Sequence, residues 1–386
     1  MNRYNLLLTC VILVACASSP TGAPPTFVFI IPSPMPLIPE FIAPSATFDP
    51  DGTPTSAQPA AGEPTASAPP ASEVAASAFP PPDTAAPGVA PDRAARLARL
   101  AGVKDWLYQL QEINLGQVAS SNFDLVVTDY SRDGTPEGQW SAGEVVRMKQ
   151  GGRLVIAYVS IGEAEDYRFY WNSAWDDQPR DGIPDPDAPL WLEAANSEWC
   201  DLPDSCNYKV RFWDPDWQKI IMGSPTSYID RIMAAGFDGI YLDIVDAYEY
   251  FQESEGRAQA AQEMIDFVTA IANYTRVTKG NPGFFVFPQN AEGLAEYPNY
   301  VQVIDGIGKE DVFYVLDERQ PPDEAKYSVG LLNVIRDSGG IVLSVDYVST
   351  PQNIADYYGR ARAEGYVPYA TVLNLDRMTI NAGFEP

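Results

Sequence analysis

Short apolar segments alternate with stretches of helical periodicity over most of the chain after residue 104. The apolar segments are rich in β-branched and aromatic residues, which is typical of buried strands. The helical stretches end in glycine and lead into an apolar segment. Because continuous apolar strands alternate with helices, the pattern predicts a parallel sheet covered on both faces. Strands are predicted at 105–110, 123–130, 153–162, 208–214, 237–243, 283–288, 303–308, 340–347 and 366–376.

The number of strand–helix units selects the architecture within the α/β class. Eight such units in about 270 residues fit a closed (β/α)8 TIM barrel. No glycine-rich phosphate-binding loop follows an early strand, which disfavours a doubly wound sheet. Nine strands are predicted, so one is surplus, and we assign 366–376 as an extra C-terminal strand. Residues 164–207, after the third strand, form the longest irregular insertion and are expected to form a lid or wall over one end of the barrel.

The N-terminal sequence MNRYNLLLTCVILVAC has the features of an export signal. Arg3 precedes an apolar run of about ten residues, which is too short to span a bilayer as a helix. The run ends in Leu-Val-Ala-Cys, which resembles a bacterial lipobox. We therefore predict a lipoprotein signal peptide at 1–15 and lipidation of Cys16. The alternative is an ordinary signal peptide that is cleaved at another position.

Proline and small residues dominate the segment 16–92. Of the 35 prolines in the chain, 19 lie in this segment, which contains no Lys or Arg. Such a segment has too little clustered apolar surface to offset its ordering entropy, so we expect a disordered or polyproline-like tether. The folded domain would then be 93–386, held at a bacterial cell surface or in the extracellular space by a lipid anchor that is its only membrane contact.

Cysteine usage predicts one disulfide in the folded part. Cys200 and Cys206 are six positions apart, with a turn-forming Pro-Asp pair between them. In an exported protein such a pair most simply forms a disulfide that closes a loop. Metal ligation is the alternative, but zinc or iron would need more Cys or His ligands than the sequence offers. The acidic loops 129–134 and 176–187 do not follow the full calcium-loop spacing, so no metal is predicted.

Charge and the absence of histidine exclude several function classes. The formal net charge of −27 argues against nucleic acid or an anionic membrane as a partner, and leaves a cationic or neutral substrate. An acidic surface also keeps many secreted proteins soluble. Without histidine there is no Ser–His hydrolase and no histidine general base. A pair of carboxyl groups remains for acid–base work, which is the arrangement that cleaves glycosidic bonds.

Acids and amides follow almost every predicted strand. In a (β/α)8 barrel, residues at the C-terminal ends of the strands converge on one working face. A single acid there is explained by a solvated loop, but the repeated placement predicts an acidic cleft. Aromatic side chains near the same ends could stack on sugar rings, and rings and carboxylates would both attract a sugar that carries an ammonium group.

Several runs of the chain resemble a known enzyme family. The runs are AYVSIGEAEDYRFYW, VRFWDPDWQ, GFDGIYLDIVDAYEYF, GKEDVFY and VLSVDYV, in this order. They resemble glycoside hydrolase family 114, the (β/α)8 barrels related to endo-α-1,4-polygalactosaminidase, over about 105–376. The bacterial extracellular branch, often labelled cysteinyl-tRNA synthetase related, is most similar. A synthetase is excluded because the chain lacks a His-bearing nucleotide motif, a KMSKS-like loop and a basic surface for tRNA.

The resemblance places the family's two catalytic carboxylates on Asp243 and Glu310. It also matches Asp246 to a second acid and Asn290 to an amide, whereas Glu249 is assigned to the following loop or helix with no role in chemistry.

Two positions and one stretch depart from the family pattern. Tyr241 stands where the family has an acid two residues before Asp243, and Gln289 stands where it has lysine. Glu163 and Glu165 lie in a stretch that differs from those hydrolases. Substrate identity therefore transfers less well than fold and site location.

The resemblance implies a surface-anchored, endo-acting glycoside hydrolase that acts on an α-1,4-linked galactosamine-containing polysaccharide. It implies no cofactor, and the chain is expected to be a monomer. The departures leave an alternative open, a non-catalytic carbohydrate-binding lipoprotein with the same barrel. Other residues are expected to bind substrate or to tune the pKa values of the catalytic pair. They are Asp129, Tyr158, Glu163, Asp246, Asn290, Asp346 and Tyr347.

Overall fold

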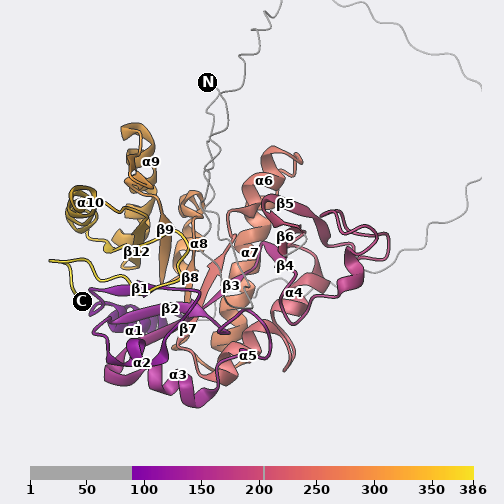
Figure 1. Cartoon of the computed structure of the whole chain (residues 1–386), viewed down its shortest axis with the longest axis horizontal. Helices are drawn as coiled ribbons and strands as arrows, with labels where there is room; N and C mark the ends of the chain where they lie inside the picture. Colours follow the sequence, from indigo (N-terminus) through magenta and orange to yellow (C-terminus); the bar gives the residue numbers. More distant parts are fainter. Residues whose placement is uncertain (1–88, 203–204) are drawn as a thin grey trace, which may run out of the picture. The chain divides into compact units, whose positions relative to one another are not determined.

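The computed structural model describes residues 89–202 and 205–386 (Figure 1). The expected signal peptide, Cys16 and most of the expected tether lie outside these residues, so their assignments stay predictions. Helix α1 (Val89–Leu100) opens the described part and begins before residue 93, where we expected the domain to start. Within the described ranges, no helix is both long enough and apolar enough to cross a bilayer.

Eight short parallel strands form the centre of the domain. Hydrogen bonds order them as β1-β2-β3-β7-β8 and β9-β12-β13, and a bridge between Gln289 and Gly308 joins β8 to β9. The last strand lies beside the first, with the rings of Trp106 and Tyr369 6.0 Å apart. This order is consistent with a (β/α)8 barrel. The strands are β1 (Trp106–Tyr108), β2 (Leu125–Asp129), β3 (Leu154–Ser160), β7 (Gly239–Asp243), β8 (Phe285–Pro288), β9 (Gly306–Glu310), β12 (Ile341–Asp346) and β13 (Val367–Ala370).

The assignment of the surplus strand was wrong. Strand β13, from the segment 366–376, pairs in parallel with β12 and supplies the eighth strand. The surplus segment is 208–214, whose first three residues (208–210) pair antiparallel in a separate sheet outside the parallel strands. Its sequence YKVRFWD alternates apolar with polar or charged residues at its start, which is typical of an antiparallel strand with one buried face.

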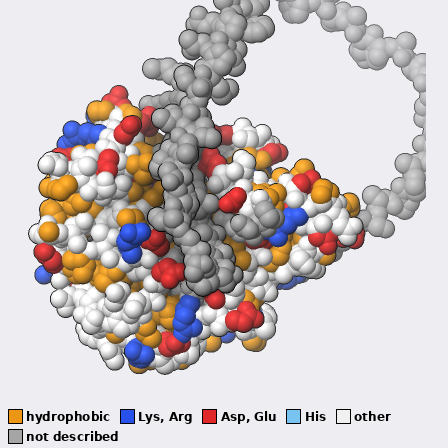
Figure 2. Space-filling model, in the orientation of Figure 1, with side chains coloured by type: hydrophobic (Ala, Val, Ile, Leu, Met, Phe, Trp, Pro, Cys, Tyr) orange, Lys and Arg blue, Asp and Glu red, His pale blue; other side chains and the backbone are white. Residues whose placement is uncertain are grey.

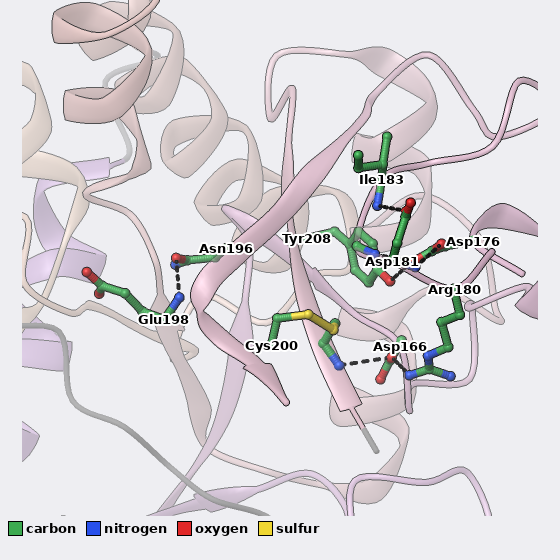
Figure 3. Close-up of a disulfide and its surroundings, with 11 residues drawn as sticks. Asp166, Asp176, Arg180, Asp181, Ile183, Asn196, Glu198, Cys200 and Tyr208 are labelled. Atoms are coloured by element: carbon green, nitrogen blue, oxygen red, sulfur yellow. Dashed lines mark hydrogen bonds and ion pairs between the residues drawn. A yellow bond between two sulfur atoms is a disulfide. The ribbon is translucent and has the colours of Figure 1, made fainter. Parts of the chain in front are cut away.

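The insertion 164–207 forms most of this separate sheet, which has the order β4-β6-β5. The strands are β4 (Glu163–Glu165), β5 (Leu192–Asp201) and β6 (Ser205–Val210). A disulfide between Cys200 and Cys206 joins β5 to β6, which confirms the predicted pairing (Figure 3).

Helices connect the parallel strands, and the expected start and stop signals hold at several of them. Helix α3 (Ala142–Met148) begins with a capping box formed by Ser141 and Glu144, and helix α5 (Tyr228–Ala235) ends at Gly236 in the left-handed conformation. The remaining helices are α2 (Leu115–Ser120), α4 (Pro215–Ile221), α6 (Ala247–Glu253), α7 (Ala260–Asn273), α8 (Pro298–Val303), α9 (Pro322–Asp337) and α10 (Pro351–Ala363). Short elements are η1 (Gln150–Gly152), η2 (Ser173–Trp175), η3 (Tyr274–Thr278), η4 (Glu292–Glu296), β10 (Tyr314–Val315) and β11 (Glu318–Arg319).

Tyr241 packs among the aromatic residues enclosed by the strands. Its ring lies 5.3 Å from that of Tyr108 and 6.4 Å from that of Trp106, measured between centroids. A Cβ atom on Gly308 would lie 1.7 Å from the Tyr241 hydroxyl oxygen, so glycine is required opposite this ring. The position that carries an acid in the resembling family is therefore a packing position in this chain.

Candidate active site

A cavity of ≈ 670 Å³ opens at the C-terminal ends of the parallel strands. Its lining includes Tyr108 from β1, Tyr158 from β3, Asp243 from β7 and Glu310 from β9, together with Tyr347, which follows β12. These residues come from strands far apart in the sequence. The cavity is therefore at the face where (β/α)8 enzymes carry their active sites.

Asp243 is the last residue of β7 and lies beside β3, which supplies its hydrogen-bond donor. The hydroxyl group of Tyr158 donates to Oδ2 of Asp243. Burial raises the pKa of Asp243 to about 7, the charge of Glu310 adds to this rise, and the bond from Tyr158 opposes it. Asp243 is thus a carboxyl group that can hold or release a proton near neutral pH.

Glu310 ends β9 and is held by donors from two other strand ends. The hydroxyl group of Tyr347 donates to Oε1, and the side-chain amide of Asn290 donates to Oε2 at 2.7 Å. The backbone N–H of Glu310 donates in turn to Oδ1 of Asn290 at 3.1 Å. The structure therefore brings the predicted residues Asn290, Tyr347 and Glu310 together, and fixes the direction of the carboxylate.

Strained backbone conformations gather at the same strand ends. Ile244, Asn290 and Asp311 have φ values of 53°, 58° and 55°, in the left-handed region. Asparagine tolerates this region, but a β-branched isoleucine there is an outlier. Gly162 permits the conformation at Ile244, because a Cβ at position 162 would lie 2.0 Å from the Ile244 carbonyl oxygen. Strain of this kind is a feature of functional sites, and no sequence pattern had indicated it.

The cavity is strongly acidic. Lys309 pairs with Glu292 at 3.5 Å, and it faces the carboxyl groups of Asp311, Glu310 and Asp246, which raise its pKa against the effect of burial. Burial raises the pKa of Asp311 to about 8, with Glu310 adding to the rise. The lining contains two basic residues, Lys309 and Arg319, and eight acidic ones, Asp243, Asp246, Glu249, Glu292, Glu310, Asp311, Glu318 and Glu324. A cation is therefore attracted to this cavity.

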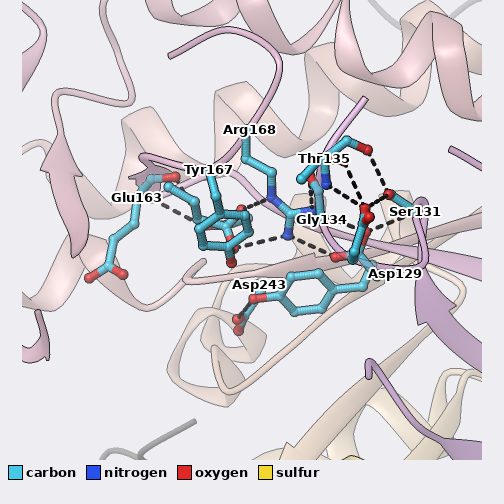
Figure 4. Close-up of polar contacts among 12 residues, drawn as sticks. Asp129, Ser131, Gly134, Thr135, Glu163, Tyr167, Arg168 and Asp243 are labelled. Carbon is cyan, nitrogen blue, oxygen red and sulfur yellow. Dashed lines mark hydrogen bonds and ion pairs between the residues drawn. The ribbon is translucent and has the colours of Figure 1, made fainter. Parts of the chain in front are cut away.

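Asp129 was predicted to bind substrate, but it lies in a buried ion cluster. Its carboxylate pairs with Arg168 at 2.8 Å and accepts from the backbone N–H of Ser131 at 2.9 Å. Arg168 also pairs with Glu165 at 2.6 Å, and Figure 4 shows Arg168 directed toward Asp129. Only 6% of Asp129 is exposed, and it is not among the residues that line the cavity. Its role is to tie β2 to the start of the insertion.

Asp346 is also buried and does not reach the cavity. Its carboxylate accepts hydrogen bonds from the backbone N–H groups of Val312, Phe313 and Tyr314 at 2.9, 3.0 and 2.9 Å. These residues follow Glu310 by two to four positions. Asp346 therefore holds the loop after Glu310, and it is not among the residues placed to touch a substrate in the cavity.

Glu163 lies next to the cavity rather than in its lining. Its Oε1 accepts from the side-chain amide of Asn196 at 2.8 Å, and Figure 4 shows its carboxylate directed away from Arg168. Burial raises the pKa of Glu163 to about 7. Its charge contributes to the raised pKa of Asp243 and of Asp246. Glu163 therefore affects the protonation of these two carboxyl groups, although its own hydrogen-bond partner, Asn196, belongs to the insertion.

Asp246 lines the cavity as predicted, and three other residues join it unexpectedly. Burial, with the charges of Asp243 and Glu249, raises the pKa of Asp246 well above its usual range. Glu249 lines the cavity too, contrary to our assignment. Tyr108 donates to Oε1 of Gln289 at 2.9 Å, and its position at the end of the first strand could have indicated it. Trp199 also lines the cavity. No pattern in the sequence indicated this, because its position depends on how the insertion folds.

Aspartates of the two acidic loops 129–134 and 176–187 accept hydrogen bonds from nearby groups of the chain. Asp133 accepts from the N–H and hydroxyl of Thr135, and Asp176 accepts from the N–H groups of Asp181 and Gly182. Over residues 89–202 and 205–386, no group of three or more His, Cys, Asp or Glu side chains is placed to hold a metal ion.

The sequence matches a family model and several other proteins. The model described as glycoside-hydrolase family GH114 matches residues 88–383. An uncharacterized protein of Methanocaldococcus jannaschii is 42% identical over 275 residues, which are 68% of this chain and 74% of that protein. An uncharacterized protein of Thermotoga maritima is 36% identical over 296 residues, which are 73% of this chain and 85% of that protein.

The structure is similar to a solved bacterial domain. The glycoside hydrolase domain of PelA from Pseudomonas aeruginosa superposes with a TM-score of 0.50 and 19% identity. The match covers 72% of this chain and 98% of that domain. At this level of identity the likeness shows a shared fold.

Proposed function

The chain belongs to glycoside-hydrolase family GH114, and from this premise we propose that it cleaves bonds inside a polysaccharide with Asp243 and Glu310 as its two catalytic carboxyl groups. The observation that carries the proposal is that both side chains line one cavity at the strand ends, each fixed by a tyrosine hydroxyl. Two carboxyl groups in one cleft are what glycosidic hydrolysis requires.

Hydrolysis of the glycosidic bond requires one of the two carboxyl groups to be protonated and the other to be ionised. One carboxyl group donates its proton to the glycosidic oxygen as the bond to the anomeric carbon breaks. The other, ionised, either attacks that carbon itself or takes a proton from the water that attacks it. The raised pKa of Asp243, to which the charge of Glu310 contributes, lets Asp243 carry a proton near neutral pH.

We propose an α-1,4-linked galactosamine-containing polysaccharide as the substrate. The excess of acidic over basic side chains in the cavity suits a sugar with a free ammonium group. Figure 2 shows that acidic side chains also lie over the visible face of the domain, among apolar side chains and several patches of Lys or Arg. An ammonium-bearing chain would lose part of this attraction when its amino groups are acetylated.

The location of the protein is part of the proposal. We infer a lipid anchor at Cys16 on a bacterial cell surface, with no membrane contact by the catalytic domain and no nucleic acid partner. Phase partition of the wild type into detergent, lost in Cys16→Ser, would support the anchor. Equal partition of both proteins into the aqueous phase would contradict it.

The experiment that tests the function compares two polymers. Purified protein is incubated with α-1,4-linked galactosamine polymer and with its N-acetylated form, and the released oligosaccharides are sized. We expect a ladder of internal cleavage products from the free-amine polymer and far less from the acetylated one. Tight binding of the polymer without released product would instead support the non-catalytic carbohydrate-binding alternative.

A further inference from the structure

Trp199 contributes an aromatic wall to the cavity from outside the parallel strands. It belongs to β5 of the insertion sheet, yet it lines the same cavity as Asp243 and Glu310. The insertion therefore shapes the site directly and is more than a cover over the barrel end.

Two contacts fix the short segment that carries Trp199. At one end, the side-chain amide of Asn196 donates to Oε1 of Glu163 at 2.8 Å. At the other end, the next residue, Cys200, is bonded to Cys206 of β6, as Figure 3 shows.

The pairing of β5 with β6 shifts register between Ala195 and Cys200. Such irregularities bend a strand and redirect its side chains. The segment is therefore held at both ends while the irregularity sets the direction of the tryptophan.

The polar group of Trp199 differs from those of the nearby tyrosines. The hydroxyl groups of Tyr108, Tyr158 and Tyr347 donate to Gln289, Asp243 and Glu310, so protein acceptors already use them. The indole N–H of Trp199 is buried and, within the described ranges, has no hydrogen-bond partner. Buried tryptophan N–H groups usually find an acceptor. A ligand hydroxyl could supply one.

We propose that Trp199 is a sugar-binding subsite of the cleft, on which a pyranose ring of the substrate chain stacks while a sugar oxygen accepts from the indole N–H. The inference rests on the proposed function and names a residue that binds the chain rather than one that reacts. Because the disulfide and the bond from Asn196 to Glu163 set the position of the segment, the subsite also depends on them.

The test separates binding from chemistry. KM and kcat for galactosamine polymer are measured for the wild type, Trp199→Phe, Trp199→Ala and Trp199→Gln. We expect Trp199→Ala and Trp199→Gln to raise KM about tenfold with kcat changed by less than about twofold, and Trp199→Phe to raise KM less because a ring remains. Leu190→Ala, at an exposed site on the same insertion, is the control and should leave both parameters unchanged.

Binding without turnover gives a second readout. The dissociation constant of the polymer is measured in an Asp243→Asn background with and without Trp199→Ala, and circular dichroism verifies folding. We expect the same tenfold weakening, and a similar weakening when Cys200 and Cys206 are both replaced by serine.

The two possible failures are distinguishable. Cleavage by the wild type with unchanged KM and unchanged binding in the folded Trp199 variants overturns the subsite and leaves the proposed function intact. Absence of both cleavage and binding by the wild type overturns the proposed substrate, and the subsite with it.

Discussion

The hydroxyl group of Tyr347 donates a hydrogen bond to one carboxylate oxygen of Glu310 from the neighbouring strand end. Asn290 occupies the other oxygen, so the carboxylate has one orientation in the cavity. Tyr347→Phe removes a donor without changing the shape of the ring. We expect kcat to fall roughly 10- to 100-fold, because misaligned catalytic groups lose transition-state stabilisation, with a smaller change in KM.

Steady-state kinetics on galactosamine polymer measure this loss. Tyr300→Phe is a matched control, since Tyr300 is buried, is not among the cavity-lining residues, and its hydroxyl has no partner within the described ranges. A Tyr347→Phe enzyme as active as that control would contradict the role of the bond.

The bond from Tyr158 to Asp243 predicts a pH effect. Burial and Glu310 raise the pKa of Asp243 to about 7, and the Tyr158 hydroxyl opposes the rise. Tyr158→Phe therefore should move the limb of the pH profile that Asp243 governs to higher pH, by about one unit. The measurement is kcat/KM from pH 5 to 9, with the surface variant Tyr297→Phe as control. A profile that coincides with that of the wild type would refute the prediction.

Buried carboxyl groups also predict how stability depends on pH. The pKa of Asp243 and of Glu163 is about 7 in the folded protein, against ordinary values of 3.8 and 4.5. A raised folded pKa gives stability that is complete below about pH 4 and is lost as the pH rises through about 7. We expect the melting temperature to be roughly a few degrees higher at pH 5 than at pH 8.

Glu163→Gln removes one of these ionisable groups and keeps an oxygen for Asn196 to donate to. The difference in melting temperature between pH 5 and pH 8 should shrink in this variant. A difference as large as that of the wild type would mean that Glu163 does not contribute.

The sequence predicts which residues lie at the ends of the strands, but it does not predict which of them face the cavity. Asp243, Glu310 and Asn290 lie at or just after the C-terminal ends of apolar strands, and the parallel architecture brings them to one cavity. Asp129 ends a strand in the same way, yet it pairs with Arg168 inside the protein. Strand position alone cannot distinguish a carboxylate that faces a cavity from one that faces a buried cation.

The insertion 164–207 was the other source of error in the predicted strands and cavity lining. The segment 208–214, which contains the end of β6, was counted among the barrel candidates because of its aromatic and β-branched residues, although its antiparallel pairing places it in the separate sheet. Trp199 reaches the cavity through this sheet. Contacts of that kind depend on long-range pairing, which no local pattern in the sequence specifies.

Close packing between Gly308 and Tyr241 predicts a stability effect. A Cβ at position 308 would overlap the Tyr241 ring, so Gly308→Ala should lower the free energy of unfolding by about 1–3 kcal/mol or more. Gly330→Ala is the control, because nothing lies within 4 Å of its added Cβ and alanine favours helix α9. Denaturant unfolding compares the two variants. Equal stability of both would show that the interior relaxes around the extra methyl group.

The most direct test of the account is the rate of reducing-end release from α-1,4-linked galactosamine polymer by Asp243→Asn and Glu310→Gln. Glu296→Gln, which is exposed and not among the cavity-lining residues, is the control. We expect each catalytic-site variant to lose more than about 100-fold in kcat while remaining folded and able to bind polymer, with the control at the wild-type rate. Wild-type rates in both Asp243→Asn and Glu310→Gln would contradict the assignment of the carboxylate pair.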